Sequence, residues 1–241
     1  MVQKSNNYHG INHLQFLLAK KIDDMDFTSE RVMLAVLKRA MKDSKMLAPT
    51  GREGQAKTTG IASYVLTQPN SFYISIGQSY TPTNFFSEMI DAVSRGKEKA
   101  HGNMYLMMRQ LSNLLTENDS KKLIVVDDAG KLSPRGLGLF HELRDKTMHC
   151  TGFVFCGVTY FKEKLENAMK KGTPGVAEFY RRVQGWPEVP NIDSNDIKEY
   201  CKARKLTPEE TVLVKKAKLE TVAQLEIFVD KIIEMRNPDT K

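Results

Sequence analysis

The segment from Gly51 to Thr58 constrains the fold of this chain more than any other part of the sequence. It reads Gly-Arg-Glu-Gly-Gln-Ala-Lys-Thr, follows a short apolar stretch and precedes a stretch, 59–67, with the pattern of a helix. This arrangement approaches the motif G-x-x-x-x-G-K-[S/T], in which successive backbone amides converge on phosphate oxygens at the start of a helix. The sequence therefore predicts a phosphate-binding loop within an α/β domain.

The positions of this loop have separate predicted roles. Lys57 is expected to reach the β- and γ-phosphates of ATP, and the Thr58 hydroxyl to ligate Mg²⁺. Ala56 stands where the motif normally has its last glycine, which is tolerable if the residue keeps a negative φ and costly otherwise. The predicted nucleotide-binding residues are Gly51, Arg52, Glu53, Gly54, Gln55, Ala56, Lys57, Thr58 and Thr59.

A second apolar run, Leu123–Val126, ends in two carboxylates, Asp127 and Asp128. This is a Walker B pattern: a buried parallel strand that delivers acidic side chains to the carboxyl edge of the sheet, where ligands bind. Asp127 is predicted to hold Mg²⁺ through water. Asp128 stands where a glutamate commonly orients the attacking water, but its side chain is one methylene shorter.

Strand-like and helix-like segments alternate through most of the chain. Strands are expected at 45–48, 71–76, 123–126 and 151–156. Helices are expected at 11–22, 27–42, 59–67, 83–94, 103–116, 134–146 and 160–171. The alternation predicts a parallel sheet flanked by helices on both faces.

Beyond residue 188 only helical patterns follow, and one of them, Thr207-Pro-Glu-Glu210, is a capping box with proline at the first helical position. We therefore expect an N-terminal arm or tail at 1–26, an α/β P-loop ATPase domain at 27–188 and a small all-helical lid at 189–241.

Composition adds few constraints. The net charge of +7 permits binding to a polyanion without requiring it. No apolar run approaches the length of a membrane span, and the first residues lack the apolar core of a secretory signal. Cys150, Cys156 and Cys201 show no metal-ligand spacing and no paired framework, which is typical of a protein in a reducing cytoplasm.

The order of these parts resembles an AAA+ ATPase. Within that superfamily the chain is similar to the transposition target-selection ATPases, typified by the phage Mu B protein and related transposon ATP-binding proteins. The similarity covers about residues 27–235. It rests on Gly51–Thr58, Tyr73–Gly77 with Thr81-Pro82, Leu123–Asp128, Phe153–Gly157 and Glu178–Val183.

The resemblance implies further site residues. A residue after the fourth strand should contact the γ-phosphate or the attacking water; Thr159 is the nearest polar candidate, since Val158 occupies the place where related sequences often have asparagine. Arg181 or Arg182 falls at the place of an arginine finger, which stabilises transition-state charge in a neighbouring subunit's site. The sequence does not choose between these two arginines.

The matching helix of the lid, 221–231, has no sensor-2 arginine. Together with Ala56 and Asp128, this absence favours slow or partner-stimulated hydrolysis, with ATP and Mg²⁺ serving mainly to control assembly.

The resemblance also implies partners: double-stranded DNA bound without sequence specificity, further copies of the chain in an ATP-dependent ring or filament, and a transposase. Basic loops could follow a phosphate backbone, and the candidate residues are Arg95, Lys97, Lys99, Lys131 and Arg135. We expect an ATP-dependent regulator of DNA transposition that assembles on target DNA and recruits or stimulates a transposase.

Three other functions remain open on the sequence alone. One is a helicase loader or another AAA+ DNA machine. Another is a nucleotide-switched module that binds a protein partner and no DNA, and the last is a nucleotide-binding scaffold without catalysis.

Overall fold

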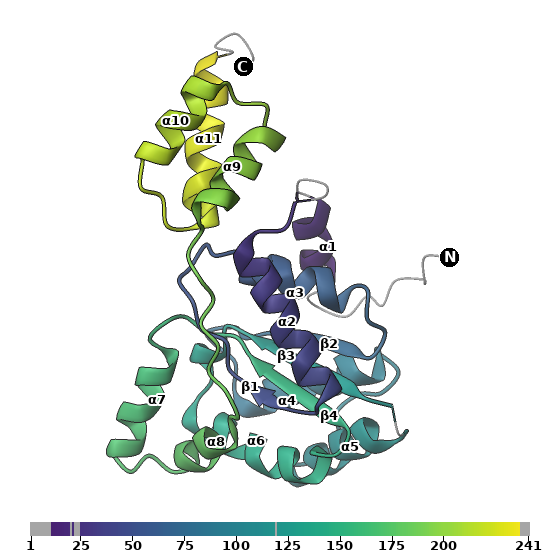
Figure 1. Ribbon diagram of the computed structural model, residues 1–241. Coiled ribbons are helices and arrows are strands. Elements are labelled where there is room, and N and C mark those ends of the chain that lie inside the picture. The colour runs from purple at the N-terminus through teal and green to yellow at the C-terminus, as the bar shows by residue number, and fades with distance from the viewer. Residues whose placement is uncertain (1–10, 20, 22–24, 119, 237–241) are drawn as a thin grey trace.

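The computed structural model describes residues 11–19, 21, 25–118 and 120–236, and every structural statement below refers to these residues. They form an α/β body and, above it in Figure 1, a bundle of three helices near the C-terminal end. None of the described helices is long and apolar enough to cross a membrane.

The body is built on a parallel sheet of four strands in the order β1-β4-β3-β2. The strands are β1 (Met46–Leu47), β2 (Ser71–Ser75), β3 (Lys122–Asp127) and β4 (Thr151–Phe155). Every residue of β3 and β4 is buried, as expected for central strands whose runs of apolar residues are covered on both faces. The predicted fold class is therefore confirmed. β1, β2 and β4 are slightly shorter than expected, whereas β3 is longer because it also includes Lys122 and Asp127.

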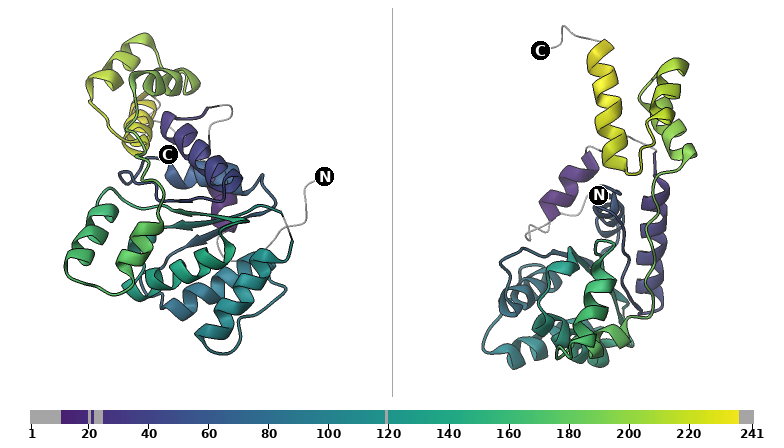
Figure 2. Two further views of the ribbon diagram at one scale, coloured as in Figure 1. Left: turned by 60° about the horizontal axis from the view of Figure 1, so that its bottom comes forward. Right: turned by 90° about the vertical axis from the view of Figure 1, so that its left-hand side faces the viewer.

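One face of the sheet is covered by α2 (Thr28–Lys42) and α3 (Lys57–Val65), and α1 (Ile11–Ala19) packs against α3. Figure 2 (left) shows these helices, in purple and dark blue, on the opposite side of the strands from the teal helices. Gly152 in β4 permits the close approach of α2, because a Cβ there would lie 2.1 Å from the carbonyl oxygen of Ala40.

The other face carries α4 (Pro82–Ser94), α5 (Met104–Thr116), α6 (Pro134–Thr147) and α8 (Val176–Arg182), with α7 (Phe161–Lys170) beside α8. Aromatic rings fill the space beneath them: the Phe140 ring lies 4.7 Å from that of Phe155, which lies 4.9 Å from that of Phe179. These edge-to-face contacts join α6, β4 and α8 into one core.

The C-terminal bundle, which we call the lid, consists of α9 (Ser194–Ala203), α10 (Pro208–Lys216) and α11 (Val222–Arg236). It has a hydrophobic core of its own that includes Ile197, Val214 and Leu225. The capping box predicted at the start of α10 is present, with Thr207 as N-cap and proline at the first helical position.

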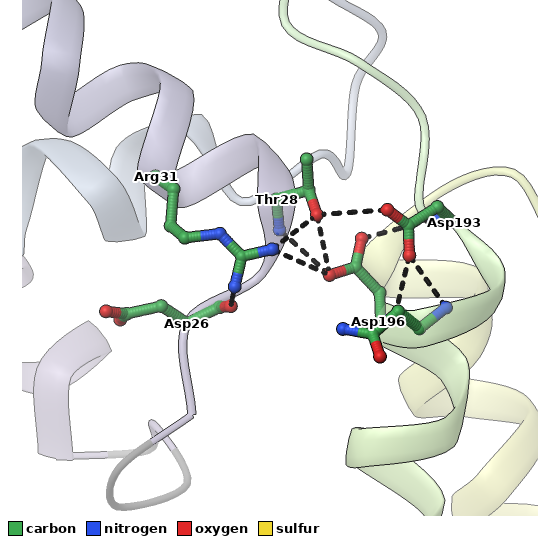
Figure 3. Close-up of polar contacts among 6 residues, drawn as sticks. Asp26, Thr28, Arg31, Asp193 and Asp196 are labelled. Carbon is green, nitrogen blue, oxygen red and sulfur yellow. Dashed lines mark hydrogen bonds and ion pairs between the residues drawn. The ribbon is translucent and has the colours of Figure 1, made fainter.

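The lid is attached to the body at the beginning of α2. Phe27 belongs to the lid core, with its ring 5.7 Å from that of Tyr200, although the sequence assigned residue 27 to the body. Next to it, Asp196 of α9 accepts hydrogen bonds from the backbone amide (2.9 Å) and the hydroxyl (3.0 Å) of Thr28 (Figure 3). Arg31 also donates to the Thr28 hydroxyl, at 2.7 Å.

The predicted N-terminal helix is shorter than expected and ends at Ala19. Its buried residues, Ile11 and Leu14, join the main core of the body. Of the predicted arm or tail, residues 1–10, 20 and 22–24 lie outside the described residues.

Candidate nucleotide-binding site

A cleft of about 680 Å³ separates the carboxyl edge of the sheet from the lid. It is lined by the loop 53–59, by Asp127 and Asp128, and by the lid residues Tyr200, Arg204 and Ala223. Two stretches that are 70 positions apart in the sequence, predicted separately to bind phosphate and metal, therefore meet in one place. A cleft of this size, open to solvent between two parts of a chain, suits a small ligand.

The loop before α3 presents unsatisfied donors. Among the described residues, none hydrogen-bonds to the backbone amides of Arg52 through Ala56, which lead into the positive end of the α3 dipole. The Lys57 ammonium folds back on the same loop and donates to the carbonyl oxygens of Gly51 (2.9 Å) and Arg52 (2.6 Å). Free amides, a helix N-terminus and an ammonium together fit the phosphate chain of a nucleotide.

Ala56 adopts the left-handed conformation, with φ of 54° and ψ of 26°. The sequence alone left the sign of this φ open, and the structure gives the unfavourable one, which costs a residue with a Cβ about 1–2 kcal/mol. Glycine is the residue that occupies this conformation without the steric cost. Ala56, where the sequence departs from the motif, is therefore strained at the end of the loop.

The predicted phosphate-binding loop also touches the lid, a contact that the sequence did not reveal. The carbonyl oxygen of Gly54 accepts a hydrogen bond from the amide of Ala223 at 3.0 Å, at the start of α11. Beside it, Arg52 forms an ion pair with Glu220. A Cβ added to Gly54 would lie 2.8 Å from the Cβ of Ala223, so the close approach of loop and lid depends on glycine.

The substitution Gly54→Ala is expected to push the lid from the loop. Both the collision with Ala223 and the φ of +77° oppose the new methyl group, so we expect the free energy of unfolding to fall by about 1–3 kcal/mol and ATP affinity to fall with it. Gly96→Ala is the matched control, because Gly96 has a φ of +74° but nothing within 4 Å of its added Cβ. Thermal unfolding and nucleotide titration should separate the two variants; equal effects would mean that backbone strain alone is at work.

Asp127 lies at the carboxyl end of β3 and is buried at the base of the cleft. Its Oδ2 accepts hydrogen bonds from the Thr58 hydroxyl (2.8 Å) and from the Tyr73 hydroxyl (3.3 Å). Burial raises the pKa of the Asp127 carboxyl, while the Thr58 hydrogen bond and the positive charge of Lys57 oppose that rise. A nearby cation would offset the cost of burying this charge.

The chemistry of these donors fits Mg²⁺. A hydroxyl and a carboxylate supply hard oxygen atoms, which Mg²⁺ prefers, and the ion commonly completes its shell with water and phosphate oxygens. Among the described residues, no group of three or more His, Cys, Asp or Glu side chains could hold a metal ion. One hydroxyl and one carboxylate suit a cation that arrives with a nucleotide and takes its other ligands from phosphate and water.

Asp128 also borders the cleft, but its carboxylate is engaged. Its Oδ2 lies 2.6 Å from the Lys131 ammonium, and its backbone is in the left-handed conformation with φ of 56°. The side chain is half exposed, so it can exchange this ion pair for another partner. To orient a water molecule, Asp128 would have to turn from Lys131 into the cleft.

The other predicted catalytic residues lie outside this cleft. Thr159 is exposed in a turn and borders a separate depression with Arg52 and Gln55, whereas Cys156 and Val158 border the cleft itself. Burial raises the pKa of the Cys156 thiol well above its usual value, so the thiol stays protonated beside Asp127.

Arg181 and Arg182 end α8 but have different surroundings. Arg182 forms an ion pair with Asp145, with its Nε 2.9 Å from Oδ1, and this partner lowers the pKa of the Asp145 carboxyl. Arg181 is exposed and has no polar partner in the described part of the chain.

The candidate DNA-binding residues do not form one surface. Arg95 donates to the carbonyl of Pro69, which precedes β2 at the amino edge of the sheet, whereas Lys131 and Arg135 follow β3 at the carboxyl edge. Lys99 is paired with Asp91 at 2.8 Å. Lys97 and Arg135 are exposed, and within the described ranges neither side chain has a polar partner.

The remaining walls of the cleft come from residues that sequence reasoning missed. Glu30 of α2 is buried, and its Oε2 lies 2.6 Å from the Lys21 ammonium. Burial raises the pKa of Glu30 to about 7, against the opposing effect of Lys21. Arg204, at the end of α9, lies over the Tyr200 ring at 6.0 Å and is paired with Asp230. For this wall the sequence offered one indication: the acidic residue Glu30 lies within the predicted amphipathic helix 27–42.

Comparisons with known proteins agree with this geometry. A family model described as an AAA domain matches residues 38–165, which is more than half of the chain and includes both the loop and Asp127-Asp128. Among curated protein sequences, none matches this chain.

Three solved structures illustrate the similarity of fold. The Orc1 protein of Aeropyrum pernix in complex with DNA has a TM-score of 0.61 and 16% identity, and the match covers 97% of this chain and 66% of that one. The replication initiator DnaA, bound to AMPPCP and single-stranded DNA, has a TM-score of 0.55 and 16% identity. The match covers 90% of this chain and 64% of DnaA. Cdc6p of Pyrobaculum aerophilum has a TM-score of 0.53 and 18% identity, and the match covers 77% of this chain and 50% of Cdc6p.

At these identities the likeness establishes the fold alone. The chain spans only half to about two thirds of the length of these three proteins.

Proposed function

Because the chain belongs to the AAA domain family, we propose that it is an ATPase that binds ATP with Mg²⁺ between the body and the lid and assembles on DNA in its ATP state. The observation that carries this proposal is the loop of unsatisfied amides at Arg52–Ala56, closed by Lys57 and adjacent to the Thr58–Asp127 hydrogen bond. Phosphate and cation subsites that lie next to each other suit a nucleotide carried by Mg²⁺.

Each residue then has a chemical task. The amides of the loop bind phosphate oxygens, and Lys57 exchanges its two carbonyl partners for the β- and γ-phosphates. Thr58 and Asp127 would hold the ion, which neutralises charge on the phosphates when bound. Asp128 orients the attacking water after leaving Lys131, and Arg181 supplies a positive charge to the site of a neighbouring subunit.

We propose double-stranded DNA as the polyanionic partner. Support comes from the net charge of +7, from the exposed cations Lys131 and Arg135 near the carboxyl edge, and from the DNA-bound state of Orc1, a protein of similar fold. DnaA, also of similar fold, is bound to single-stranded DNA. Because Lys131 also pairs with Asp128, a DNA phosphate that engaged Lys131 would free the Asp128 carboxylate. Binding to DNA and hydrolysis would then be linked through one lysine.

The specific cellular role is a separate question. Regulation of transposition, with a transposase as partner, remains a prediction from the motif resemblance to the Mu B-type ATPases. The three similar structures carry the names Orc1, DnaA and Cdc6p, and DnaA is named as a replication initiator, which favours the alternative of another AAA+ DNA machine. Tighter binding to duplex DNA than to single strands, together with binding to a transposase and not to a helicase, would support the role in transposition.

Binding to duplex DNA of arbitrary sequence, in the presence of ATP, is expected to weaken steeply as salt is raised. Replacing Lys131 and Arg135 with alanine should reduce the slope of log affinity against log salt by about 2, because each phosphate contact contributes about 0.9. Lys215→Ala with Lys216→Ala, on exposed positions of α10, removes the same charge from another surface and should leave the slope unchanged. Fluorescence anisotropy across a salt series provides the measurement.

If the wild-type protein binds ATP but no DNA even at low salt, the DNA-binding part of the proposal is wrong. A nucleotide-switched module that binds a protein partner would then be the better reading of the same cleft.

A further inference from the structure

Tyr73 is a buried tyrosine at the base of the nucleotide cleft to which no role has been assigned. It lies in β2, in register with Val125 of β3, and two residues ahead of the pair Ser75–Asp127. Side chains two apart along a strand share one face of the sheet, so Tyr73 and Asp127 lie on the same face. Tyr73 is 1% exposed, and its hydroxyl lies 3.3 Å from Oδ2 of Asp127.

Donors from several parts of the fold hold the Asp127 carboxylate. Thr58 at the start of α3 donates to Oδ2, as does Tyr73 from β2, while the amide of Asp128 donates to Oδ1 at 3.0 Å. A carboxylate with partners on both oxygens has little freedom to rotate. Of these donors, Thr58 is itself a predicted ligand of the ion, whereas Tyr73 and the Asp128 amide can act only through Asp127.

Packing alone does not explain a tyrosine at this position. A phenylalanine would fill the same space, and a buried hydroxyl without a partner would be costly. A phenol is ordinarily protonated at neutral pH, so the Tyr73 hydroxyl can donate to the carboxylate 3.3 Å away. The hydroxyl therefore matches a requirement of the carboxylate and not of the hydrophobic core.

We propose that Tyr73 is a positioning residue of the Mg²⁺ site, which holds the Asp127 carboxylate in the orientation that accepts the ion beside Thr58. The proposal deepens the proposed ATPase function and depends on it. Groups that orient a metal-binding side chain typically contribute 10–100-fold to metal affinity without touching the metal.

The substitution Tyr73→Phe removes only the hydroxyl and tests this role by binding. A fluorescent ATP analogue is titrated against the full-length protein in EDTA and then at increasing Mg²⁺. In EDTA the affinity of the variant should equal that of the wild type, because the phosphate-binding amides are untouched. The Mg²⁺ concentration that gives half of the affinity increase should rise about tenfold.

Tyr64→Phe is the matched control. Tyr64 is also buried, and its hydroxyl contacts the sulfur of Met41 at 3.2 Å on α2, away from the cleft. It should leave both the EDTA affinity and the Mg²⁺ requirement unchanged, so a shift confined to Tyr73→Phe cannot come from the loss of a buried hydroxyl as such.

A double-variant cycle adds a readout that a purely structural role would not move. If Tyr73 acts through Asp127, then Tyr73→Phe should have no further effect on the Mg²⁺ dependence once Asp127→Asn is present.

An unchanged Mg²⁺ requirement in Tyr73→Phe, or an equal loss of affinity with and without Mg²⁺, would overturn the positioning role. Failure of the wild type to bind the ATP analogue at all would instead refute the proposed function, and the inference with it.

Discussion

Replacement of Lys57 with alanine is expected to weaken ATP binding at least a hundredfold. In the structure the Lys57 ammonium lies among the carbonyl groups of the loop, 2.9 Å from the oxygen of Gly51 and 2.6 Å from that of Arg52. A charge-assisted hydrogen bond from it to a phosphate contributes about 1.5–3 kcal/mol, and it contacts two phosphates. Titration with a fluorescent ATP analogue measures the loss.

The same substitution should abolish ATP-dependent assembly, which light scattering or electron microscopy would detect with and without duplex DNA. Lys38→Ala serves as the control, because Lys38 is exposed on α2 and its substitution removes the same charge. Since Lys57 also ties the loop to itself, thermal unfolding of both variants should be measured in the absence of nucleotide. A Lys57→Ala protein with wild-type nucleotide affinity would refute the assignment of the phosphate-binding loop.

The parts of this site that the sequence predicted are those set by short-range patterns. A strand, a glycine-rich turn and a helix are local, so the position of Lys57 follows from neighbouring residues. Apolar strands that end in carboxylates are local too, and the rule that parallel strands share a carboxyl edge brings Asp127 to Thr58. The fold class followed from the alternation of these patterns.

The parts that could not be predicted depend on contacts between distant residues. The positive φ of Ala56 is set by the loop as a whole, and alanine occurs with either sign. The contact of Gly54 with Ala223 joins positions far apart in the chain, as does that of Thr28 with Asp196. Phe27 resembles any first apolar residue of an amphipathic helix, and nothing local indicates that it packs into the lid core.

The surroundings of the Asp128 carboxylate could not be predicted from the sequence either. Its place after Asp127 indicates a position near the attacking water, but the ion pair with Lys131 depends on the turn that follows β3. Sequence reasoning had placed Lys131 among the candidates for DNA binding only. The structure connects it to a predicted catalytic residue as well.

Hydrolysis by the assembled protein is expected to fall about a thousandfold in Arg181→Ala. A guanidinium supplied by a neighbouring subunit stabilises charge on the transferred phosphoryl group and is worth about 10³–10⁵ in turnover. The two candidate arginines differ in availability: Arg182 is held by Asp145 on its own subunit, whereas Arg181 is exposed and has no polar partner among the described residues. We therefore expect Arg181 to be the finger.

Arg182→Ala is the control for this prediction. It breaks an exposed ion pair, which contributes about 0–1 kcal/mol to stability, and should leave turnover within about twofold of the wild type. Both variants should bind ATP as monomers with unchanged affinity, because neither arginine borders the cleft of its own chain. A large loss of turnover in Arg182→Ala with none in Arg181→Ala would reverse the assignment.

Mixing two inactive variants tests whether the arginine acts between subunits. Arg181→Ala retains an intact nucleotide cleft but supplies no finger, and Lys57→Ala supplies a finger but binds no ATP. In a mixed assembly, a Lys57→Ala subunit can present its Arg181 to the ATP bound by an Arg181→Ala neighbour, so part of the hydrolysis should return. If the arginine acted within its own chain, neither variant could complete the other, and the mixture would stay as inactive as its components.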